Sequence, residues 1–496
     1  MEEKHELKRG WILAALMLTM TLAAMDITIV STVIPQIVSD LGGFSKFTWV
    51  FSVYLLAQTV TIPLYGKLSD IFGRKKILLF GIVVFLIGSG TSAAAWDITS
   101  LILFRGIQGI GAGSIMATVN TIAGDIYSVK ERARIQGYLS SIWGISAILG
   151  PALGGALAEF VNWRWIFIIN LPFGALAIVF LILFLKENVQ KQETKIDLKG
   201  AFLILITLSG FLLFLLEGGQ KWPWLSWQNL VFLLLILFFA LWTYRVESKT
   251  KNAIMPIALW KNKTLANTSL AMMSMGIVMM GPETFLPTFA QASLGLGVIA
   301  SGFVLASMSI GWPTASSLSG RLYLRIGFRE TSMIGASVIF LSCLGFLFIP
   351  YPQPVYLLVI NQIFLGAGFG LLSTPSLVGP QSMVPWNQRG MVTSGIVFSR
   401  NLGQSIGTAI FGAIFNNTLN AKMVGLSEEI SYSTQNIMQV LHASEIAEST
   451  KEFIRVAIHL SMRNIYIALV VFAVCAFFFI FRVPHRGPKD TTFLKI

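Results

Sequence analysis

The sequence predicts an all-α, polytopic membrane protein made of two six-helix bundles with two further helices between them. Three observations support this fold class. Of the 496 residues, 55% are hydrophobic and 12% are charged, whereas soluble globular domains carry about 25% charged residues. The apolar residues fall into fourteen runs that are long enough to cross a bilayer. Glycine and arginine positions of the first half recur in the second half.

The apolar runs match the length of membrane-spanning helices. About 20 helical residues are needed to cross the ~30 Å hydrocarbon core. The first run is longer than the apolar region of a signal peptide, so we expect it to be retained. In order, the predicted spans are 11–34, 48–65, 77–95, 101–124, 136–159, 164–185, 198–217, 228–245, 265–290, 296–318, 331–349, 355–377, 390–415 and 461–481.

Basic residues set the predicted orientation. Most of the 36 Lys and Arg residues fall in connections that share a side with the N-terminus, and such segments lie in the cytoplasm by the positive-inside rule. We therefore expect a multi-pass protein of the cell inner or plasma membrane with cytoplasmic N- and C-termini. The same distribution explains the net charge of +13 without a nucleic-acid partner. The longest outer connection, 416–461, has an acidic balance.

The sequence lacks the residues that several other classes of function require. An intramembrane enzyme needs a His, Ser or metal constellation inside the spans, but the four histidines lie in tails, in a loop or near a span end. The two cysteines, Cys343 and Cys475, lie in predicted spans and imply no disulfide framework. No segment matches a GxxxxGK[ST] nucleotide-binding loop. We expect a protein that is not an enzyme, has no cofactor or metal, and is driven by an ion gradient.

The two halves are related by an internal repeat. The segment GKLSDIFGRKK (66–76) has a counterpart 254 residues later, GRLYLRIGFR (320–329). A second set recurs 257 residues apart and comprises Gly109/Gly366, Gly111/Gly368, Gly113/Gly370, Arg132/Arg389, Gly150/Gly407 and Gly155/Gly412. We infer an N-terminal bundle (1–190), a C-terminal bundle (264–496) and an insertion between them (191–263). The inserted helices either join two bundles that move independently or line the pathway.

Four segments in register resemble motifs of the major facilitator superfamily, and specifically of its fourteen-helix drug:proton antiporter branch. They are MDITIVSTVIP (25–35), GKLSDIFGRKK (66–76), LILFRGIQGIGAG (101–113) and GISAILGPALGG (144–155). The resemblance covers nearly the whole chain. It implies a major facilitator fold and a proton-coupled multidrug efflux antiporter that exports lipophilic, cationic compounds by alternating access. A proton-coupled symporter, or an exporter of an endogenous metabolite, lipid-like or siderophore-like molecule, is the alternative.

The second of these segments implies a conformational latch. Its two glycines permit tight backbone geometry. The resemblance implies that Asp70 caps the N-terminal end of a helix near 391–395 and that Arg74 pairs with Asp125, which would hold the halves together in the outward-open state. A solvated turn held by local pairs is the alternative. The latch residues are Gly66, Asp70, Gly73, Arg74 and Asp125.

The fourth segment resembles a helix-five motif that is associated with exporters. Small residues let a neighbouring helix approach closely, and a proline inside a helix removes a backbone donor and bends it. The residues of this motif are Gly144, Gly150, Pro151, Gly154 and Gly155.

Three ionisable residues, Asp26, Arg105 and Glu283, lie inside spans at similar depth in the outer half. Such residues are costly in a bilayer and mark functional sites. The resemblance implies that Asp26 and Arg105 can pair within one bundle, with Glu283 across the cavity from them. A neighbouring cation favours the charged form of a carboxylate, so we assign cation attraction to Asp26 and proton carriage mainly to Glu283. A structural ion pair is the alternative for Asp26. We expect Arg400, near a cytoplasmic span end, to snorkel.

Other polar and adaptable side chains in the spans are possible substrate contacts. Methionine and aromatic side chains adapt to varied apolar ligands, although lipid contact and core packing explain them as well. The candidates are Gln58, Asn120, Trp143, Met279 and Asn361. The expected partners are small lipophilic substrates, protons and membrane lipids, and we expect a monomer.

Overall fold

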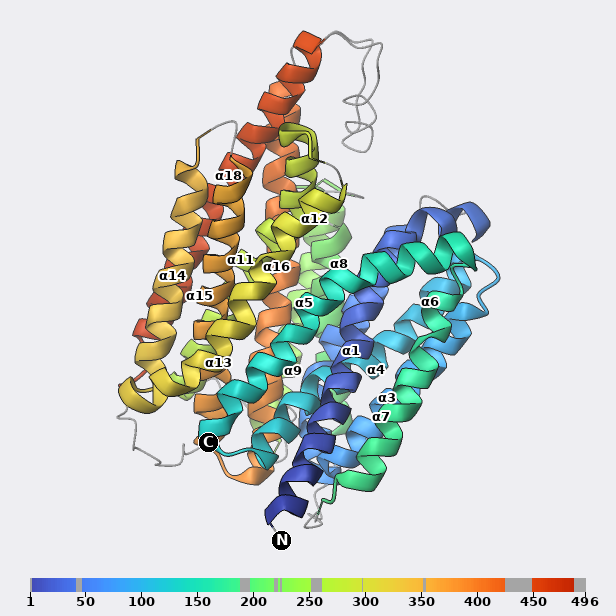
Figure 1. Ribbon diagram of the computed structural model, residues 1–496, viewed down its shortest axis with the longest axis vertical. Helices are drawn as coiled ribbons and strands as arrows, with labels where there is room; N and C mark the ends of the chain where they lie inside the picture. The colour runs from blue at the N-terminus through green and yellow to red at the C-terminus, as the bar shows by residue number, and fades with distance from the viewer. Residues whose placement is uncertain are drawn as a thin grey trace.

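The computed structural model describes residues 2–41, 47–187, 197–217, 222–223, 225–250, 261–296, 298–350, 354–423 and 448–485. These residues are mainly α-helical (Figure 1). The first half contains α1 (Glu2–Leu41), α2 (Phe47–Phe72), α3 (Arg74–Ala93), α4 (Ile98–Ile126), α5 (Val129–Phe160), α6 (Trp165–Ile168) and α7 (Asn170–Phe184). Two helices follow, α8 (Leu198–Glu217) and α9 (Trp227–Lys249). The second half contains α11 (Lys263–Leu294), α12 (Val298–Ala306), α13 (Met308–Ile326), α14 (Phe328–Phe348), α15 (Val355–Ser382), the short 3-10 helix η2 (Trp386–Gln388), α16 (Arg389–Met423) and α18 (Glu448–Phe481).

Local signals in the sequence fix several helix ends. The Asp97 side chain accepts a hydrogen bond from the backbone N–H of Ser100, and the Ser100 hydroxyl accepts one from the backbone N–H of Asp97, which forms a capping box at the start of α4. Asn262 caps α11 through the N–H groups of its first residues. Gly295 ends α11 with a φ of 65°, a conformation that favours glycine.

Each half packs as a bundle of its own. In the first half, α4 packs against α2 and α3, and α1 packs against α5 and α7. In the second half, α11 packs against α16 and α18, and α15 packs against α13 and α14. The halves meet mainly where α5 contacts α13 and α2 contacts α16. We call the end of the molecule where α1 begins and α18 ends the terminal end; the bundles converge there and diverge toward the opposite end (Figure 1).

The number of spanning helices differs from the sequence prediction. Within the described residues, twelve helices are long and apolar enough to cross a membrane, so the predicted count of fourteen is not confirmed. The α12–α13 segment and α16 are not among the twelve. α12 and α13 are separated at Ser307, and both α13 and α16 carry many polar residues.

Two predicted connections are largely helical. The segment 66–76 was expected to be a loop, but α2 continues to Phe72 and α3 begins at Arg74. The turn is confined to Gly73, whose φ is 97°, and the repeat places Gly327, with a φ of 101°, between α13 and α14. Helices α16 and α18 also extend into the predicted loop 416–461; its central part, 424–447, lies outside the described residues.

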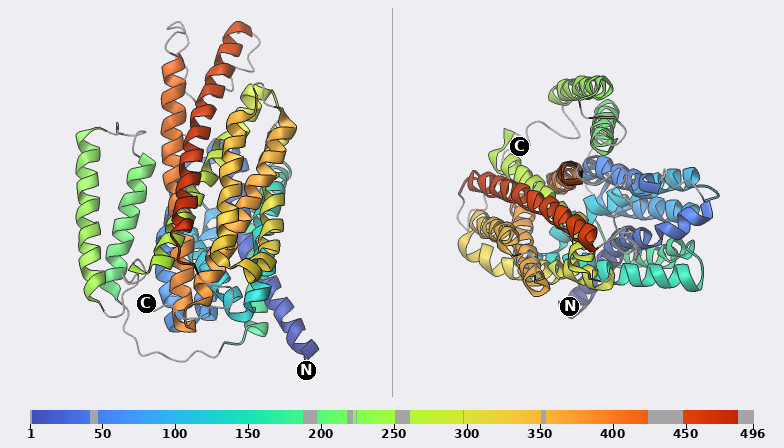
Figure 2. Two further views of the ribbon diagram at one scale, coloured as in Figure 1. Left: turned by 90° about the vertical axis from the view of Figure 1, so that its left-hand side faces the viewer. Right: turned by 90° about the horizontal axis from the view of Figure 1, so that it is seen from above.

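The inserted helices stand beside the two bundles (Figure 2). α8 and α9 pack against each other, where the hydroxyl groups of Thr207 and Thr243 are 2.9 Å apart. α8 also contacts α2 and α16, and Ala201 and Ile204 pack against Leu64 of α2. The insertion therefore reaches both bundles through α8.

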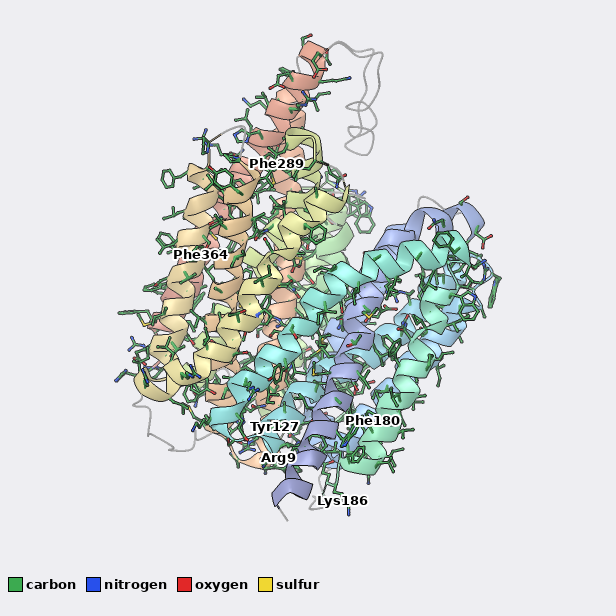
Figure 3. All side chains as sticks on the ribbon, in the orientation of Figure 1. Arg9, Tyr127, Phe180, Lys186, Phe289 and Phe364 are labelled. Carbon is green, nitrogen blue, oxygen red and sulfur yellow. The ribbon has the colours of Figure 1, made fainter. Side chains whose placement is uncertain are left out.

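The first helix is fixed to its bundle at the terminal end. The hydroxyl of Tyr127 donates a hydrogen bond of 2.8 Å to the carbonyl of Arg9 (Figure 3). Burial raises the pKa of Tyr127 to about 12, so this hydroxyl stays protonated at neutral pH. Two aromatic contacts also join α1 to α7. The centre of the Trp11 ring lies 5.2 Å from that of Phe180 and 5.6 Å from that of Phe184.

Candidate functional site

The structure brings Asp26 and Arg105 together inside the first bundle. Arg105 Nη1 lies 2.5 Å from Asp26 Oδ2, and both side chains have 0% exposure. Two amides that the sequence analysis missed complete the shell of the carboxylate. Gln108 Nε2 donates to Asp26 Oδ1 at 2.8 Å, and Asn170 Nδ2 lies 3.5 Å from the same oxygen. In this conformation the Asp26 carboxylate is sealed off, and direct contact with a substrate would require its partners to move.

The shell around Asp26 joins helices that are distant in sequence. The Arg105 guanidinium lies over the ring of Tyr54, 4.2 Å from its centre. Asn170 begins α7, directly after the break at Ile169 that ends α6, and its Nδ2 donates to Ser89 Oγ at 3.0 Å. The cluster therefore links α1, α2, α3, α4 and α7 of the first bundle.

Glu283 has a different environment. It lies on α11 between Pro282 and Pro287, is partly exposed, and forms no hydrogen bond or ion pair with any residue that the structure describes. Arg400 lies on α16, the helix that packs against α11. The Arg400 Nε is buried and has no hydrogen-bond partner among the described residues. The expectation that Arg400 snorkels stays a prediction, because the side chain is partly exposed.

Helices α11 and α16 pack closely near Arg400. A Cβ on Gly276 would collide with the Arg400 carbonyl, and one on Gly403 would collide with Met273. The two helices are thus in close contact at the level of Arg400. The sequence analysis did not relate Arg400 to Glu283, because the two residues lie on different helices.

The internal repeat relates the charged residues of the first half to positions in the second half. Asp26 and Glu283 are 257 residues apart, and so are Arg105 and Gln362. Gln362 is fully buried, and neither of its amide atoms has a partner among the described residues. The second half therefore has an amide where the first half has an arginine, and its cation comes from α16 instead.

The latch residues meet at the terminal end, between the two halves. Asp70 Oδ1 accepts a hydrogen bond from the Gly390 N–H and Oδ2 accepts one from the Met391 N–H, each at 2.9 Å, at the start of α16. Arg74 lies 2.7 Å from Asp70 and 3.0 Å from Asp125. The side chains are thus arranged as the sequence resemblance implied.

Gly66 differs from the expectation, because it lies within helix α2 and makes no turn. A Cβ there would collide with Ser394 on α16. Its small size allows α2 to approach the other half closely.

Two further latch residues were missed. Arg389 Nη1 lies 3.0 Å from Asp125 Oδ1, so this carboxylate binds arginines from both halves. The Arg74 guanidinium also lies over the ring of Trp386, 3.5 Å from its centre. Arg389 was recognised only as the repeat partner of Arg132, and the cross-contact needed three-dimensional information.

A second polar network joins the halves beside the latch. Gln381 of α15 is buried, and its Nε2 donates to the Asn120 carbonyl at 3.1 Å and to Thr393 Oγ1 at 3.0 Å. Its Oε1 lies 3.5 Å from Arg132 Nη1. Nearby, the Tyr323 hydroxyl donates to the Val129 carbonyl. The halves are therefore held at two places at the terminal end.

The helix-five motif contacts two different neighbours. A Cβ on Gly144 would collide with Ser309 of α13, in the other half, whereas one on Gly150 would collide with Thr28 of α1. A Cβ on Gly154 would press on Ile29 of α1. Gly155 has no described neighbour within 4 Å of such an atom, so the expected close approach is absent there. The side chain of Pro151 lies outside the described part of the structure.

The candidate substrate contacts occupy several different environments. Gln58 and Asn120 are buried, and the Asn120 Oδ1 accepts from Gln136 at 3.1 Å. Trp143 is partly buried. Met279 is also partly buried, and its sulfur lies 3.4 Å from Gln404 Nε2.

Asn361 serves packing within the second bundle. Its Nδ2 donates to the Ser342 carbonyl at 3.0 Å, and its side chain lies against Gly345, both on α14. Among the described residues, no cluster of three or more His, Cys, Asp or Glu side chains could hold a metal ion.

Similarities to known proteins cover most of the chain. The family model of the Major Facilitator Superfamily matches residues 16–408. Multidrug transporter protein MdtP of Bacillus subtilis (strain 168) is 34% identical over 427 residues, which are 85% of this chain and 79% of the relative. Multidrug resistance protein 3 of the same strain is 33% identical over 438 residues, 86% of this chain and 84% of the relative.

A fungal relative and a solved structure extend the comparison. The Acurin A biosynthesis cluster MFS-type transporter of Aspergillus aculeatus (strain ATCC 16872 / CBS 172.66 / WB 5094) is 31% identical over 422 residues, 83% of this chain and 76% of the relative. The crystal structure of the human organic anion transporter MFSD10 (TETRAN) matches with a TM-score of 0.65 and 14% identity, over 95% of this chain and 99% of that chain. At that identity the structural match shows the fold alone.

Proposed function

Because this chain belongs to the major facilitator superfamily, we propose that this multi-pass membrane transporter is a proton-coupled multidrug antiporter that exports lipophilic, cationic compounds by alternating access. Relatives that are 33–34% identical carry the names multidrug transporter and multidrug resistance protein. The observation that carries the proposal is Glu283, a partly exposed carboxylate within a membrane helix that has no direct partner among the described residues. Such a group is available both to a proton and to a cation.

The proposed cycle assigns different roles to the two carboxylates. Glu283 binds either the cationic substrate or a proton from the outside, and protonation releases the substrate. Asp26 stays paired with Arg105 and keeps the first bundle rigid around the pathway. The energy comes from the proton gradient, with no cofactor. The contacts of Asp70 and Asp125 across the terminal end support an outward-facing conformation, if that end is cytoplasmic as the positive-inside rule implies.

We also propose the fourteen-span architecture of the drug:proton antiporter branch for this chain. The α12–α13 segment and α16 then cross the membrane in addition to the twelve apolar helices. Residues 1–190 and 264–496 form the two moving bundles of a monomer in the cell inner or plasma membrane, and 191–263 form the inserted pair. The contact of α8 with both α2 and α16 supports a peripheral position that spans the two bundles.

The proposal is tested with purified protein in liposomes. We expect tetraphenylphosphonium to release protons on binding and to be transported against an imposed pH gradient. The substitution Glu283→Gln should abolish proton release and coupled transport, while Gln404→Leu on the neighbouring helix should retain coupling. Coupled efflux that persists unchanged in Glu283→Gln would overturn the proposal.

One relative supports a second candidate function. The Aspergillus aculeatus transporter is named for a biosynthesis cluster, which suggests export of an endogenous product from the cell that makes it. Deletion of the gene in its own host, followed by comparison of small molecules inside and outside the cells, distinguishes this function from drug export. Energy-dependent accumulation of a solute inside the cells would favour a symporter instead.

A further inference from the structure

A cavity opens at the terminal end of the second bundle, between α11, α14, α15 and the end of α18. Its volume is about 440 Å³, open solvent at its mouth included, and its enclosed part has room for roughly two water molecules. We call this space the terminal cavity. None of its lining residues belongs to the latch or to the two carboxylate sites. The polar side chains in its wall are Thr264, Thr268, Arg329, Ser332 and Ser376.

The hydroxyl groups of the terminal cavity have unused hydrogen-bonding capacity. Thr264 and Thr268 lie one turn apart on α11, so they share a face of this helix. Their exposed fractions are 6% and 3%, and neither hydroxyl forms a hydrogen bond with any residue that the structure describes. Across the cavity, Ser332 Oγ and Ser376 Oγ are 3.3 Å apart and bond each other. Buried hydroxyls are normally bonded, so the two threonines are free to donate to an acceptor inside the cavity.

Arg329 is held in place by its neighbours but is not fully satisfied. Its Nη2 donates to the Phe481 carbonyl at the end of α18, at 2.8 Å. Its Nη1 lies 3.7 Å from Glu330 Oε1, which is too long for a hydrogen bond, and the same oxygen lies 2.5 Å from His485 Nδ1. The Arg329 Nε is buried and has no partner among the described residues. The guanidinium therefore keeps donors for an anion.

The first bundle has an anion at the equivalent position. Arg329 is the repeat counterpart of Lys75, 254 residues earlier, and Lys75 Nζ likewise donates to carbonyls at the end of its last helix, α7. There the Glu187 carboxylate accepts hydrogen bonds from the N–H groups of Arg74 and Lys75, at 2.8 and 2.9 Å, at the start of α3. At the start of α14, no side chain that the structure describes accepts from the N–H groups of Phe328 or Arg329. The second bundle thus keeps the basic residue and the helix N-terminus, which favours an anion, without the carboxylate.

We propose that the terminal cavity binds a phosphate group, which accepts hydrogen bonds from Arg329 and from the hydroxyls of Thr264 and Thr268. A phosphate suits these donors because its oxygens point in several directions and can meet groups from two helices at once. Exposed Lys263 and Arg482 at the neighbouring helix ends attract anions to this corner. The positive-inside rule predicts that the terminal end is cytoplasmic, and basic pockets between helices on that side suit anionic lipid headgroups. The phosphate therefore comes from a phospholipid headgroup or from a soluble phosphate compound, and the bound group ties α11 to α14. The inference does not depend on the transported substrate.

The experiment compares two lipids that differ only in the phosphate. Phosphatidic acid carries it, whereas diacylglycerol with the same chains does not. Delipidated full-length protein in detergent is titrated with each lipid and, separately, with potassium phosphate against potassium chloride at equal ionic strength. Native mass spectrometry measures lipid binding, and thermal unfolding measures stabilisation by each probe. In Arg329→Gln we expect the apparent Kd for the phosphate probe that binds to rise about tenfold or more, because a hydrogen bond to a charged group is lost. Thr268→Val should raise it about two- to tenfold, as loss of a neutral hydroxyl donor implies.

The control variants separate this site from general attraction to a basic surface. Arg329→Lys keeps the charge and a donor for the end of α18, as Lys75 does for α7, and should restore part of the affinity. Arg325→Gln removes an exposed arginine at the end of α13 that does not line the cavity, and it should bind as the wild type does. Thr268→Val leaves the contact of Arg329 with α18 intact, so it decides the question if Arg329→Gln does not fold.

The two kinds of probe also identify the source of the phosphate. Binding of phosphatidic acid alone supports a lipid headgroup, and stabilisation by inorganic phosphate supports a soluble compound. The inference is wrong if neither probe exceeds its phosphate-free counterpart, or if Arg329→Gln and Thr268→Val both keep the wild-type affinity. An equal loss of affinity in Arg325→Gln and Arg329→Gln would also overturn it, because the basic surface as a whole would then account for binding.

Discussion

At the scale of single residues, Asp26 and Glu283 show how the repeat has diverged. They occupy equivalent positions 257 residues apart. Asp26 is enclosed because helix α4 supplies both Arg105 and Gln108. At the equivalent of Arg105, helix α15 has Gln362, which is neutral, so Glu283 remains open. One arginine in α4 thus accounts for the different enclosure of the two carboxylates.

We expect the two carboxylates to differ in their effect on stability. Asp26→Asn leaves the Arg105 charge buried without its counterion, which should lower the free energy of unfolding by about 3–5 kcal/mol. Adding Arg105→Gln removes the unpaired charge and should recover part of this loss. Thermal unfolding in detergent measures both variants, and Glu283→Gln serves as the control with little change. Equal destabilisation by Asp26→Asn and Glu283→Gln would show that burial of the pair does not matter.

The sequence predicts part of this residue-scale arrangement. The pairing of Asp26 with Arg105 follows from their similar depth in helices of one bundle. Gln108 and Asn170 could not be assigned, because an amide in a membrane helix has many possible interhelical partners. Arg400 could not be related to Glu283, because the two residues lie on different helices, α16 and α11, whose packing the sequence does not show.

At the scale of helices, hydropathy locates the elements better than it locates their ends. The apolar run 48–65 lies within a longer helix, Phe47–Phe72, because α2 continues through the polar residues of the signature segment. α16 and α18 likewise extend beyond their apolar runs. Such extensions are stabilised by backbone hydrogen bonds and packing, which a hydropathy window does not register. The glycine-rich pattern of α5 predicted close packing but not which partner each glycine contacts.

The glycines of α5 should therefore differ in their tolerance of substitution. In Gly150→Ala the new methyl group collides with Thr28 of α1, so we expect a loss of about 1–3 kcal/mol in the free energy of unfolding. Gly155→Ala meets no described neighbour within 4 Å and should be neutral or stabilising by up to ~1 kcal/mol, because alanine favours helix. The free energies of unfolding of the two purified variants are compared by denaturation under the same conditions. A loss in Gly155→Ala as large as that in Gly150→Ala would contradict the assignment of α1 as the neighbour.

At the scale of the whole molecule, the two halves are held together at the terminal end by charge. Asp70 binds the start of α16, and Asp125 binds Arg74 and Arg389. The repeat counterpart of Asp70 is Leu324, so only one copy of the segment can make this contact. The asymmetry of the latch is visible in the sequence, whereas the contributions of Arg389 and Trp386 required the packed structure.

Weakening this latch should shift the balance between conformations. In Asp70→Asn the carboxylate no longer accepts charge-assisted hydrogen bonds from both backbone N–H groups of α16, and such bonds contribute about 1.5–3 kcal/mol. We expect the conformation open at the terminal end to become roughly 10–100 times more populated. Spin labels at the exposed positions Lys130 and Arg321 should then show a longer distance. Glu330→Gln, which alters contacts within the second half only, is the control and should keep the wild-type distance distribution, whereas an unchanged distribution in Asp70→Asn would contradict the latch.

The membrane topology of the whole chain depends on the α12–α13 segment and α16. Their low hydropathy has a structural explanation, because several of their polar side chains, such as Ser316, Ser319 and Ser399, are buried against protein and do not meet lipid. If α12–α13 crosses the membrane, the end of α13 lies on the cytoplasmic side with the terminal end; if it does not, that end stays outside. In a Cys343→Ser/Cys475→Ser background, we therefore expect Arg325→Cys to react with a membrane-impermeant maleimide only after the cells are permeabilised. Trp96→Cys, in the exposed turn between α3 and α4, should react in intact cells, and labelling of Arg325→Cys in intact cells would exclude the fourteen-span arrangement.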